Sequence, residues 1–233
     1  MRLVTWNCCK GRYEKKAPRA MALAPDVMVV QECARPREDA EGCGWTGENP
    51  NQGMAVVTSG GFSAVALPPL EDVPAYHLPY QVRGPVDFLL LSVWAQKNKV
   101  YPYVRGVYRA MERYADAIRA QPTVVMGDFN SNTIWDHQHR RSRSHSDLVA
   151  LLGEMGLVSA YHVHHAEVQG AESRPTYYHT WNRATGFHID YCFIPREWTP
   201  HVVDVQVGGY EDWADASDHR PLIVDVRLPA PAA

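Results

Sequence analysis

Short apolar runs that stop at a polar side chain recur along this sequence, and the clearest is residues 123–131, Thr-Val-Val-Met-Gly-Asp-Phe-Asn-Ser. The apolar run predicts a buried strand that ends at Gly127. Alternate residues of an extended chain point to one side, so Asp128 and Asn130 are expected to project together from the strand's carboxyl end. Catalytic groups are often held at that end of a sheet, although an acid and an amide there can also form a simple turn. The segment therefore predicts either an active-site loop or a turn.

The same pattern occurs earlier in the chain, where apolar runs lead to Asn7 and to Glu32. The Pro-rich residues 67–85 are expected to be loop and edge. Apolar runs predict further strands at residues 53–58, 86–94, 189–194, 202–207 and 222–226.

Residues 103–120 repeat apolar side chains at intervals of three and four, which predicts an amphipathic helix against a sheet. Further helices are expected at residues 18–23 and at residues 146–155, with Ser144 or Ser146 as the N-cap. The expected elements do not follow a strict βαβ rhythm. This order favours an α/β (α+β) fold of two packed sheets with outer helices over a doubly wound parallel sheet.

The chain has 233 residues and no linker-like stretch, so residues 1–228 are expected to form one domain and residues 229–233 a tail. Its 23 basic and 26 acidic side chains give a net charge of −3, which excludes binding of nucleic acid by overall charge alone. No signal segment and no apolar run of roughly 18 residues is present, which predicts a cytoplasmic monomer without membrane contact. Five cysteines without a Cys-x-x-Cys pair predict reduced thiols.

Short motifs accompany these strands in a fixed order: Thr5-Trp6-Asn7, Val30-Gln31-Glu32, Gly53-Met54-Ala55-Val56, Gly127-Asp128-Phe129-Asn130-Ser131, Ile189-Asp190-Tyr191 and Ser217-Asp218-His219. Taken alone, Ser-Asp-His is typical of a surface turn and Ile-Asp-Tyr of a strand-edge carboxylate. Together they resemble the endonuclease/exonuclease/phosphatase superfamily, the DNase I-like and exonuclease III-like phosphoesterases. This resemblance implies a four-layer sandwich, in which two face-to-face β-sheets lie between outer helices and a divalent-metal site lies at one end.

The resemblance also implies a metal site. It makes Glu32 the principal ligand, assisted by Asp218, with Asn7 close to the ion and the phosphate. Carboxylate oxygens favour Mg²⁺ or Mn²⁺ over zinc, because hard cations prefer oxygen ligands.

The remaining roles concern proton transfer and charge. By the same resemblance, Asp128 orients or deprotonates the attacking water, and Asn130 and His219 donate hydrogen bonds to the phosphoryl oxygens. Asp190 is expected to hydrogen-bond His219, which fixes its tautomer and favours its protonated form.

Two positions depart from the family pattern. Where many relatives carry His or Tyr aimed at the phosphate, this chain has Trp94, whose indole N–H is a donor only. We expect Trp94 to contact a phosphate or stack on a base. Cys9 replaces an Asp that some abasic-site endonucleases carry near the metal, which weakens the case for a specific abasic-site role.

Several further segments are candidates for substrate contact. The basic stretch around Arg140, Arg141 and Arg143 is expected to clamp backbone phosphates, or else to be a solvated loop. Tyr178 and His179 are assigned to a substrate-facing loop.

Histidines cluster elsewhere in the chain. His188 is expected to line the cleft, because it precedes the Ile-Asp-Tyr motif. The spacing of His162 and His164 matches no zinc pattern, and the pair is expected to form one polar face of a strand.

These observations predict a Mg²⁺- or Mn²⁺-dependent phosphodiesterase that acts on nucleic acid, with DNA favoured. Alternative substrates are RNA, a small phosphoester or a lipid headgroup, because fold does not select among them. A catalytically inactive binding module of the same fold is a more remote alternative. Retention of every acid and amide of the set argues against it, because clustered carboxylates repel one another without a cation.

Overall fold

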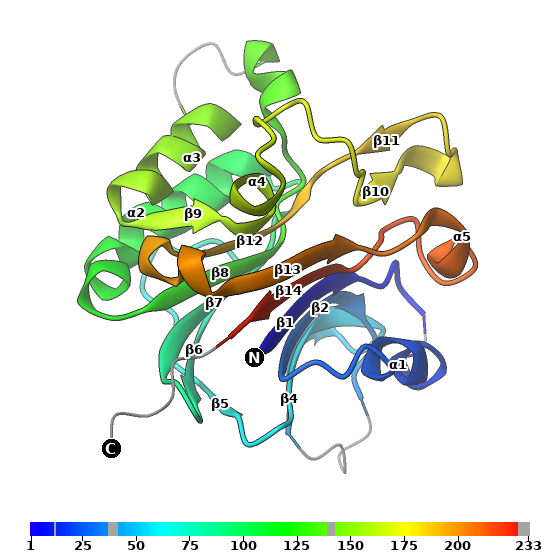
Figure 1. Ribbon diagram of the computed structural model, residues 1–233, viewed down its shortest axis with the longest axis horizontal. Coiled ribbons are helices and arrows are strands. Elements are labelled where there is room, and N and C mark those ends of the chain that lie inside the picture. The colour runs from blue at the N-terminus through cyan, green and yellow to red at the C-terminus, as the bar shows by residue number, and fades with distance from the viewer. Residues whose placement is uncertain (12, 37–41, 139–142, 228–233) are drawn as a thin grey trace.

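The computed structural model describes residues 1–11, 13–36, 42–138 and 143–227. Two six-stranded mixed sheets pack face to face, and helices cover their outer faces, which confirms the predicted sandwich (Figure 1). The expected tail at 229–233 lies outside the described residues. In the part of the chain that is described, no helix is long and apolar enough to cross a membrane.

The first sheet places the first and last strands of the chain side by side. β1 (Arg2–Asn7) pairs in parallel with β2 (Val27–Cys33) and antiparallel with β14 (Leu222–Val226). The sheet order is β13-β14-β1-β2-β4-β3, in which β13 is Val202–Val207, β4 is Gln52–Thr58 and β3 is Cys43–Asn49.

The second sheet has the order β5-β6-β7-β8-β12-β9. At its centre β7 (Phe88–Trp94) runs parallel to β8 (Thr123–Asp128), which pairs antiparallel with β12 (Asp190–Pro195). The outer strands are β5 (Ser63–Ala66), β6 (His77–Arg83) and β9 (Leu157–Ser159), and a separate hairpin joins β10 (Tyr177–Tyr178) to β11 (Gly186–Phe187).

Three hydrophobic clusters separate the four layers. One fills the space between the sheets, a second lies between the β7–β8 sheet and helices α2 and α3, and a third lies between the β1–β2 sheet and α1 and α5. The α-helices are α1 (Tyr13–Met21), α2 (Val104–Ala120), α3 (His145–Glu154), α4 (Ala160–His165) and α5 (Tyr210–Trp213). Short 3₁₀ helices are η1 (Thr133–Gln138), η2 (His179–Trp181) and η3 (Arg196–His201).

Both long helices form where their patterns predicted them. The hydroxyl of Ser144 caps α3 by accepting from the backbone N–H of Asp147, whose carboxylate accepts from Ser144 in return. Helix α1 begins before its predicted start, and Pro18 lies inside it rather than at its first turn.

The expectation that residues 67–85 are only loop and edge was wrong, because β6 lies between β5 and β7. The strand tolerates Pro79 because β5 ends at Ala66, opposite Tyr80. Leu67 N donates to Pro79 O at 2.9 Å, and in an antiparallel ladder the N–H of a residue points to the same side as its carbonyl. An N–H at Pro79 would therefore point toward Leu67, which lies beyond the last residue of β5, so its absence costs the β5–β6 pairing no hydrogen bond within the strands.

The strand predicted around His162 and His164 was also wrong, because Ala160–His165 is helix α4. Tyr161 and His165 are four apart, so they share one helix face, where their rings lie 4.7 Å apart. His162 and His164 alternate with Tyr161 and Val163, which resembled the two-residue period of a strand. Tyr161 is instead buried on one face of a helix.

Candidate active site

The polar ends of strands from both sheets meet at one end of the sandwich, and Asn7 joins them. β1 and β2 are parallel, so Asn7 and Glu32 lie near the same sheet edge, while Asp128 lies opposite Asp190 in the other sheet. Asn7 Nδ2 donates to Glu32 Oε1 at 3.2 Å and to Asp128 Oδ2 at 2.9 Å. One amide therefore bridges a carboxylate of each sheet.

Asp128 is fully buried and is held by amide donors. Besides Asn7, the backbone N–H and the Nδ2 of Asn130 donate to it, each at 2.9 Å. Burial, and then the charge of Asp190, raise the pKa of Asp128 to about 7. Only glycine fits before it, since a Cβ at Gly127 would lie 1.9 Å from the carbonyl oxygen of Val93.

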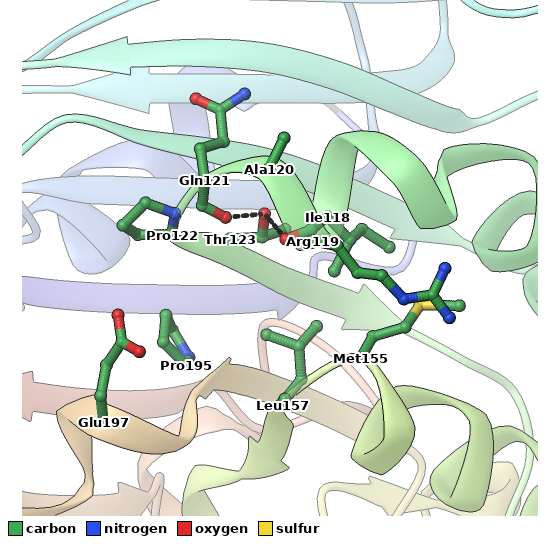
Figure 2. A pocket seen from close by; sticks show the side chains of 11 residues that line it. Ile118, Arg119, Ala120, Gln121, Pro122, Thr123, Met155, Leu157, Pro195 and Glu197 are labelled. Carbon is green, nitrogen blue, oxygen red and sulfur yellow. Dashed lines mark hydrogen bonds between the residues drawn. The ribbon is translucent and has the colours of Figure 1, made fainter.

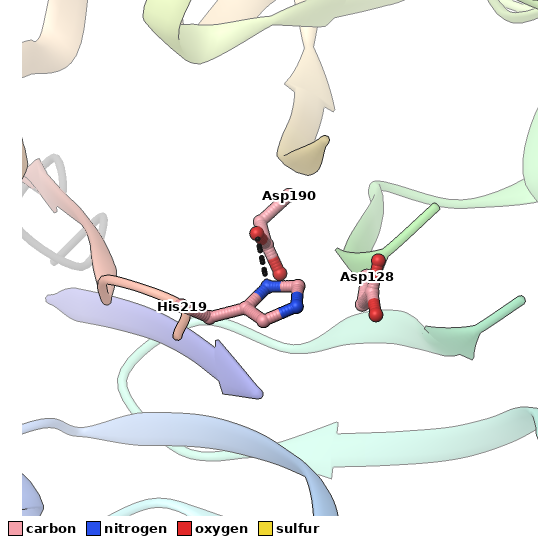
Figure 3. A group of neighbouring side chains, drawn as sticks. All are labelled: Asp128, Asp190 and His219. Atoms are coloured by element: carbon pink, nitrogen blue, oxygen red, sulfur yellow. Dashed lines mark hydrogen bonds and ion pairs between the residues drawn. The ribbon is translucent and has the colours of Figure 1, made fainter. Parts of the chain in front are cut away.

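His219 and Asp190 form a buried pair. His219 Nδ1 lies 2.9 Å from Asp190 Oδ2, and Asp128 lies beside them (Figure 3). Burial lowers the pKa of His219, but the charge and hydrogen bond of Asp190, aided by Asp128 and Asp218, outweigh it and raise the pKa to about 9. At neutral pH this imidazole is therefore protonated, with Asp190 orienting it.

The carboxylates of Glu32 and Asp218 both lie near the thiol of Cys9. Burial, followed by the charges of Asp218 and Glu32, raises the pKa of the Cys9 thiol to about 11. Glu32 sits at a bulge in the β2–β4 pairing and has a left-handed backbone with φ 57°. Its second oxygen accepts from Gln52 Nε2 at 3.3 Å. Within the described ranges, no Lys or Arg forms an ion pair with either carboxylate.

Two groups of residues are therefore candidates for a divalent cation. Ligating atoms of Asp128, Asp190 and His219 lie within 4.8 Å of one another. However, His219 is protonated and its Nδ1 is engaged by Asp190, so it offers no lone pair on that atom. Glu32 and Asp218 supply oxygen ligands without a competing cation, so their donor chemistry fits Mg²⁺ or Mn²⁺ better.

Two predicted contact residues turn out to be buried. Trp94 is 5% exposed and packs edge-on against Tyr76, 4.8 Å between ring centroids, so it offers little surface to a base. His188 does not line an open cleft, because its Nδ1 lies 2.9 Å from Arg174 O and its ring lies 4.3 Å from that of Tyr161. Both are held by residues distant in sequence.

The hairpin residues are divided between burial and exposure. Tyr178 is buried, and its ring packs against the guanidinium of Arg220. Tyr210 of α5 packs against the same guanidinium. His179 is exposed, and its Nδ1 lies 2.9 Å from the hydroxyl of Tyr177. Tyr178 is thus a packing residue in this structure, whereas His179 stays a predicted contact.

The basic stretch is only partly described. Arg143 lies 3.4 Å from Glu112 and over the ring of Tyr108, so its charge is partly neutralised. Arg140 and Arg141 lie outside the described residues, and the phosphate clamp stays a prediction.

Two histidines of α4 lie beside acids. His162 lies 3.0 Å from Glu172 and His164 lies 3.5 Å from Asp204. Across the ranges that the structure describes, these histidines belong to no cluster of three metal-ligating groups.

The structure brings to the site several residues that were not predicted to belong to it. The ring of Tyr177 lies 4.7 Å from that of His219, and its backbone forms a β-bridge with the same residue. Arg220 is fully buried, and its Nη1 donates to the carbonyls of Ser217 at 2.8 Å and His219 at 3.1 Å. The only sequence signal for Arg220 was its place next to Ser-Asp-His.

The sequence pattern described as the Endonuclease/Exonuclease/phosphatase family matches residues 4–219, a range that includes Asn7, Glu32, Asp128, Asp190, Asp218 and His219. The chain belongs to this family. Its members are phosphoesterases, which accords with the arrangement of acids, amides and a charged imidazole. No curated protein matches the chain in a sequence comparison.

Solved structures with a similar fold include a phosphatase and two AP endonucleases. A 3′ phosphatase from Neisseria, bound to a product DNA hairpin, has 20% identity and a TM-score of 0.70, covering 98% of this chain and 100% of that one. An AP endonuclease from Leishmania major has 14% identity and a TM-score of 0.68, covering 98% and 88%. An AP endonuclease from Archaeoglobus fulgidus has 15% identity and a TM-score of 0.67, covering 98% and 100%.

Proposed function

We propose that this member of the family is a Mg²⁺- or Mn²⁺-dependent phosphodiesterase that acts as a nuclease on DNA. The carrying observation is the single cluster in which Asn7 ties Glu32 to Asp128 while Asp190 holds a protonated His219. It combines an acceptor for a proton with a cationic donor, the two functions that phosphodiester hydrolysis requires.

Asp128 is proposed as the general base. A carboxylate whose pKa is raised to about 7 accepts a proton from water far more readily than an ordinary one, yet is still substantially ionised at neutral pH. Asn7 and Asn130 fix its oxygens. The sequence-based role of Asn130 changes here, because its Nδ2 already donates to Asp128 and to Ala95 O. We therefore assign Asn130 to orienting Asp128 rather than to binding the phosphate.

His219 is proposed to stabilise the negative charge that develops on the phosphoryl oxygens. Its Nδ1 is used by Asp190, so Nε2 is the donor. The geometry fits a group that binds charge electrostatically and transfers a proton when needed.

Glu32 and Asp218 are proposed to hold the divalent cation, with Asn7 nearby. When bound, the cation would polarise a phosphoryl oxygen as a Lewis acid. Glu32 accepts hydrogen bonds from the amides of Asn7 and Gln52, and among the described residues no Lys or Arg forms an ion pair with Glu32 or Asp218.

Support for DNA as substrate comes from the solved relatives, which include a 3′ phosphatase bound to a DNA product and two AP endonucleases. The test is to incubate purified protein with circular plasmid, linear duplex, single-stranded DNA, RNA and a 3′-phosphorylated oligonucleotide, each with Mg²⁺, Mn²⁺ or EDTA. Metal-dependent nicking of circles would establish endonuclease action. Cleavage of RNA alone, or of no polymer at all, would contradict the proposal.

Glu32→Gln provides the matched variant, because a neutral amide is a far poorer ligand for a hard cation than a carboxylate. Turnover with Mg²⁺ should be lost while thermal melting is unchanged. Glu48→Gln is the control, since Glu48 is exposed on β3. Equal activity of the two variants would remove Glu32 from the metal site.

A further inference from the structure

A hollow of about 220 Å³ adjoins the candidate active site through Asn130. The amide of Asn130 donates to Asp128, so a ligand in the hollow would contact a residue that is hydrogen-bonded to the proposed base. Its lining residues come from the loop after β8, η1, and the starts of α2 and α3, and they are Tyr103, Val104, Asn130, Ser131, Asn132, Trp135, Gln138 and His145.

None of these lining side chains is charged at neutral pH. His145 is buried, its Nδ1 lies 2.8 Å from Ser131 Oγ, and burial lowers its pKa to about 4. A phosphate in the hollow would find no cation among these residues. The hollow therefore suits an uncharged group with a polar edge.

Two aromatic side chains give the hollow flat apolar surface. Trp135 packs against Phe187 of β11, with 5.0 Å between centroids, and its backbone N–H donates to Asn132 O at 3.1 Å. Tyr103 stays 38% exposed in a left-handed backbone conformation with φ 48°, and its N–H donates to Gln96 O. The exposed amide of Gln138 adds a donor and an acceptor.

We infer that this hollow binds the nucleobase of a nucleotide adjoining the cleaved phosphodiester, with Trp135 as its stacking surface. The inference rests on the proposed function and adds to it a recognition element for the nucleoside. An uncharged, flat group with hydrogen-bonding edges matches the lining, and continuity with Asn130 places that group beside the reacting phosphate.

A second hollow, of about 250 Å³, does not share these properties (Figure 2). It lies at the opposite end of β8, where Thr123 begins the strand, and its lining includes Arg119 and Glu197. The hydroxyl of Thr123 is already used, donating to Gln121 O at 3.0 Å. It has no continuity with the candidate active site.

The test compares three chromogenic esters: the p-nitrophenyl esters of thymidine 5′-phosphate and of thymidine 3′-phosphate, and methyl p-nitrophenyl phosphate. Wild type should hydrolyse at least one thymidine ester with a higher kcat/KM than the methyl ester. Trp135→Ala should lower that kcat/KM by roughly 5- to 100-fold, the range for loss of base–aromatic stacking, and leave the methyl ester unaffected.

Two variants separate stacking from folding. Trp135→Phe keeps an aromatic face and should retain most of the thymidine preference, whereas Trp135→Leu fills space without one and should lose it. Ile134→Ala is the control, because Ile134 is 42% exposed on the same 3₁₀ helix and does not line the hollow.

Binding is followed independently of turnover through the indole N–H resonance of Trp135, assigned with Trp135→Phe, during titration with thymidine 5′- and 3′-monophosphates. A shift confined to Trp135, together with the thymidine preference, supports the inference. Equal loss on all three esters, or an unmoved resonance, overturns it. If no ester and no nucleic acid is hydrolysed, the proposed function fails, and the resonance alone decides whether the hollow binds a base.

Discussion

Asn7 donates to one carboxylate of each sheet, so its amide fixes the distance between the proposed metal ligand and the proposed base. Around it four carboxylates, those of Glu32, Asp128, Asp190 and Asp218, face one protonated imidazole. Burial, and then the negative charge of Asp190, raises the pKa of Asp128. Burial lowers the pKa of His219, but the negative charges of Asp190, Asp128 and Asp218 outweigh it and raise that pKa.

The pairing of Asp190 with His219 makes them one functional unit. His219→Ala and Asp190→Asn should each lower kcat/KM by a factor of about 10² to 10⁴, and the double variant should lose little more. The measurement is a double-mutant cycle on a model phosphodiester, with binding of an uncleaved substrate followed in parallel. Strictly additive losses would show that the two residues act independently.

The raised pKa of His219 also predicts how stability depends on pH in the metal-free protein. Its stabilising contribution is fully present below its ordinary value of 6.5 and is lost as pH rises through about 9. Urea unfolding in EDTA should show wild type losing on the order of 3 kcal/mol more than His219→Gln between pH 6 and pH 9.5. Parallel stability curves for the two proteins would show that the pair contributes no pH-dependent stability.

At the scale of elements, the β10–β11 hairpin and the Ser217–His219 turn are joined by Arg220. Its guanidinium lies 4.8 Å from the ring centroid of Tyr178 on the hairpin and 4.7 Å from that of Tyr210 on α5. Its Nη1 donates to two carbonyls of the turn. Arg220 therefore holds the backbone that presents Asp218 and His219.

Loss of the hydrogen bonds from Arg220 to the turn should displace His219 while leaving its imidazole present. Arg220→Met is expected to lower kcat by roughly 10- to 100-fold, the scale for a misplaced catalytic group, with a smaller change in KM, and Arg220→Lys should fall between. Arg183→Met is the matched control, because exposed Arg183 also lies over Tyr210 but contacts no carbonyl of the turn. Equal effects of Arg220→Met and Arg183→Met would assign Arg220 to hairpin packing alone.

Elements that depend on local pattern could be predicted from the sequence. The apolar runs before Asn7, Glu32 and Asp128 are strands, and the spacing of three and four in 103–120 is a helix. Strand β3 was not predicted, because its residues alternate between partly buried and exposed and include two glycines rather than an apolar run. Its position depends on pairing with β4.

The site residues likewise divide into those that local sequence patterns indicate and those whose environment depends on the folded chain. Asp128, Asp190 and His219 could be nominated because each belongs to a short motif beside an apolar strand, and these motifs together resemble the family pattern. The burial of Trp94 and His188 depends on Tyr76 and Tyr161, which only the folded chain brings to them. Likewise, full use of the Asn130 amide depends on Ala95 O, which no local pattern reveals.

At the scale of the whole molecule, the hydrophobic core between the two sheets holds the two halves of the site in their relative positions. Leu222 of β14 is fully buried there, opposite Thr5 of β1. Leu222→Ala should lower the free energy of unfolding by about 2 to 5 kcal/mol, through lost burial and the cavity left behind.

Val203→Ala on the neighbouring β13 is the control, because Val203 is 51% exposed and should change stability by roughly 0.5 kcal/mol or less. Urea unfolding followed by fluorescence and by circular dichroism gives both values. Similar costs for the two variants would mean that β14 is not part of the cooperative core.

The adjacency of β1 and β14 has a consequence for synthesis on the ribosome. In chain order Asn7 lies on β1, whereas Asp218 and His219 come shortly before β14. A nascent chain that has emerged only as far as β12 holds Glu32, Asp128 and Asp190 but lacks the imidazole of His219 and strand β14, the antiparallel partner of β1. Under the proposed function, a ribosome carrying this unfinished chain is therefore not exposed to its phosphodiesterase activity.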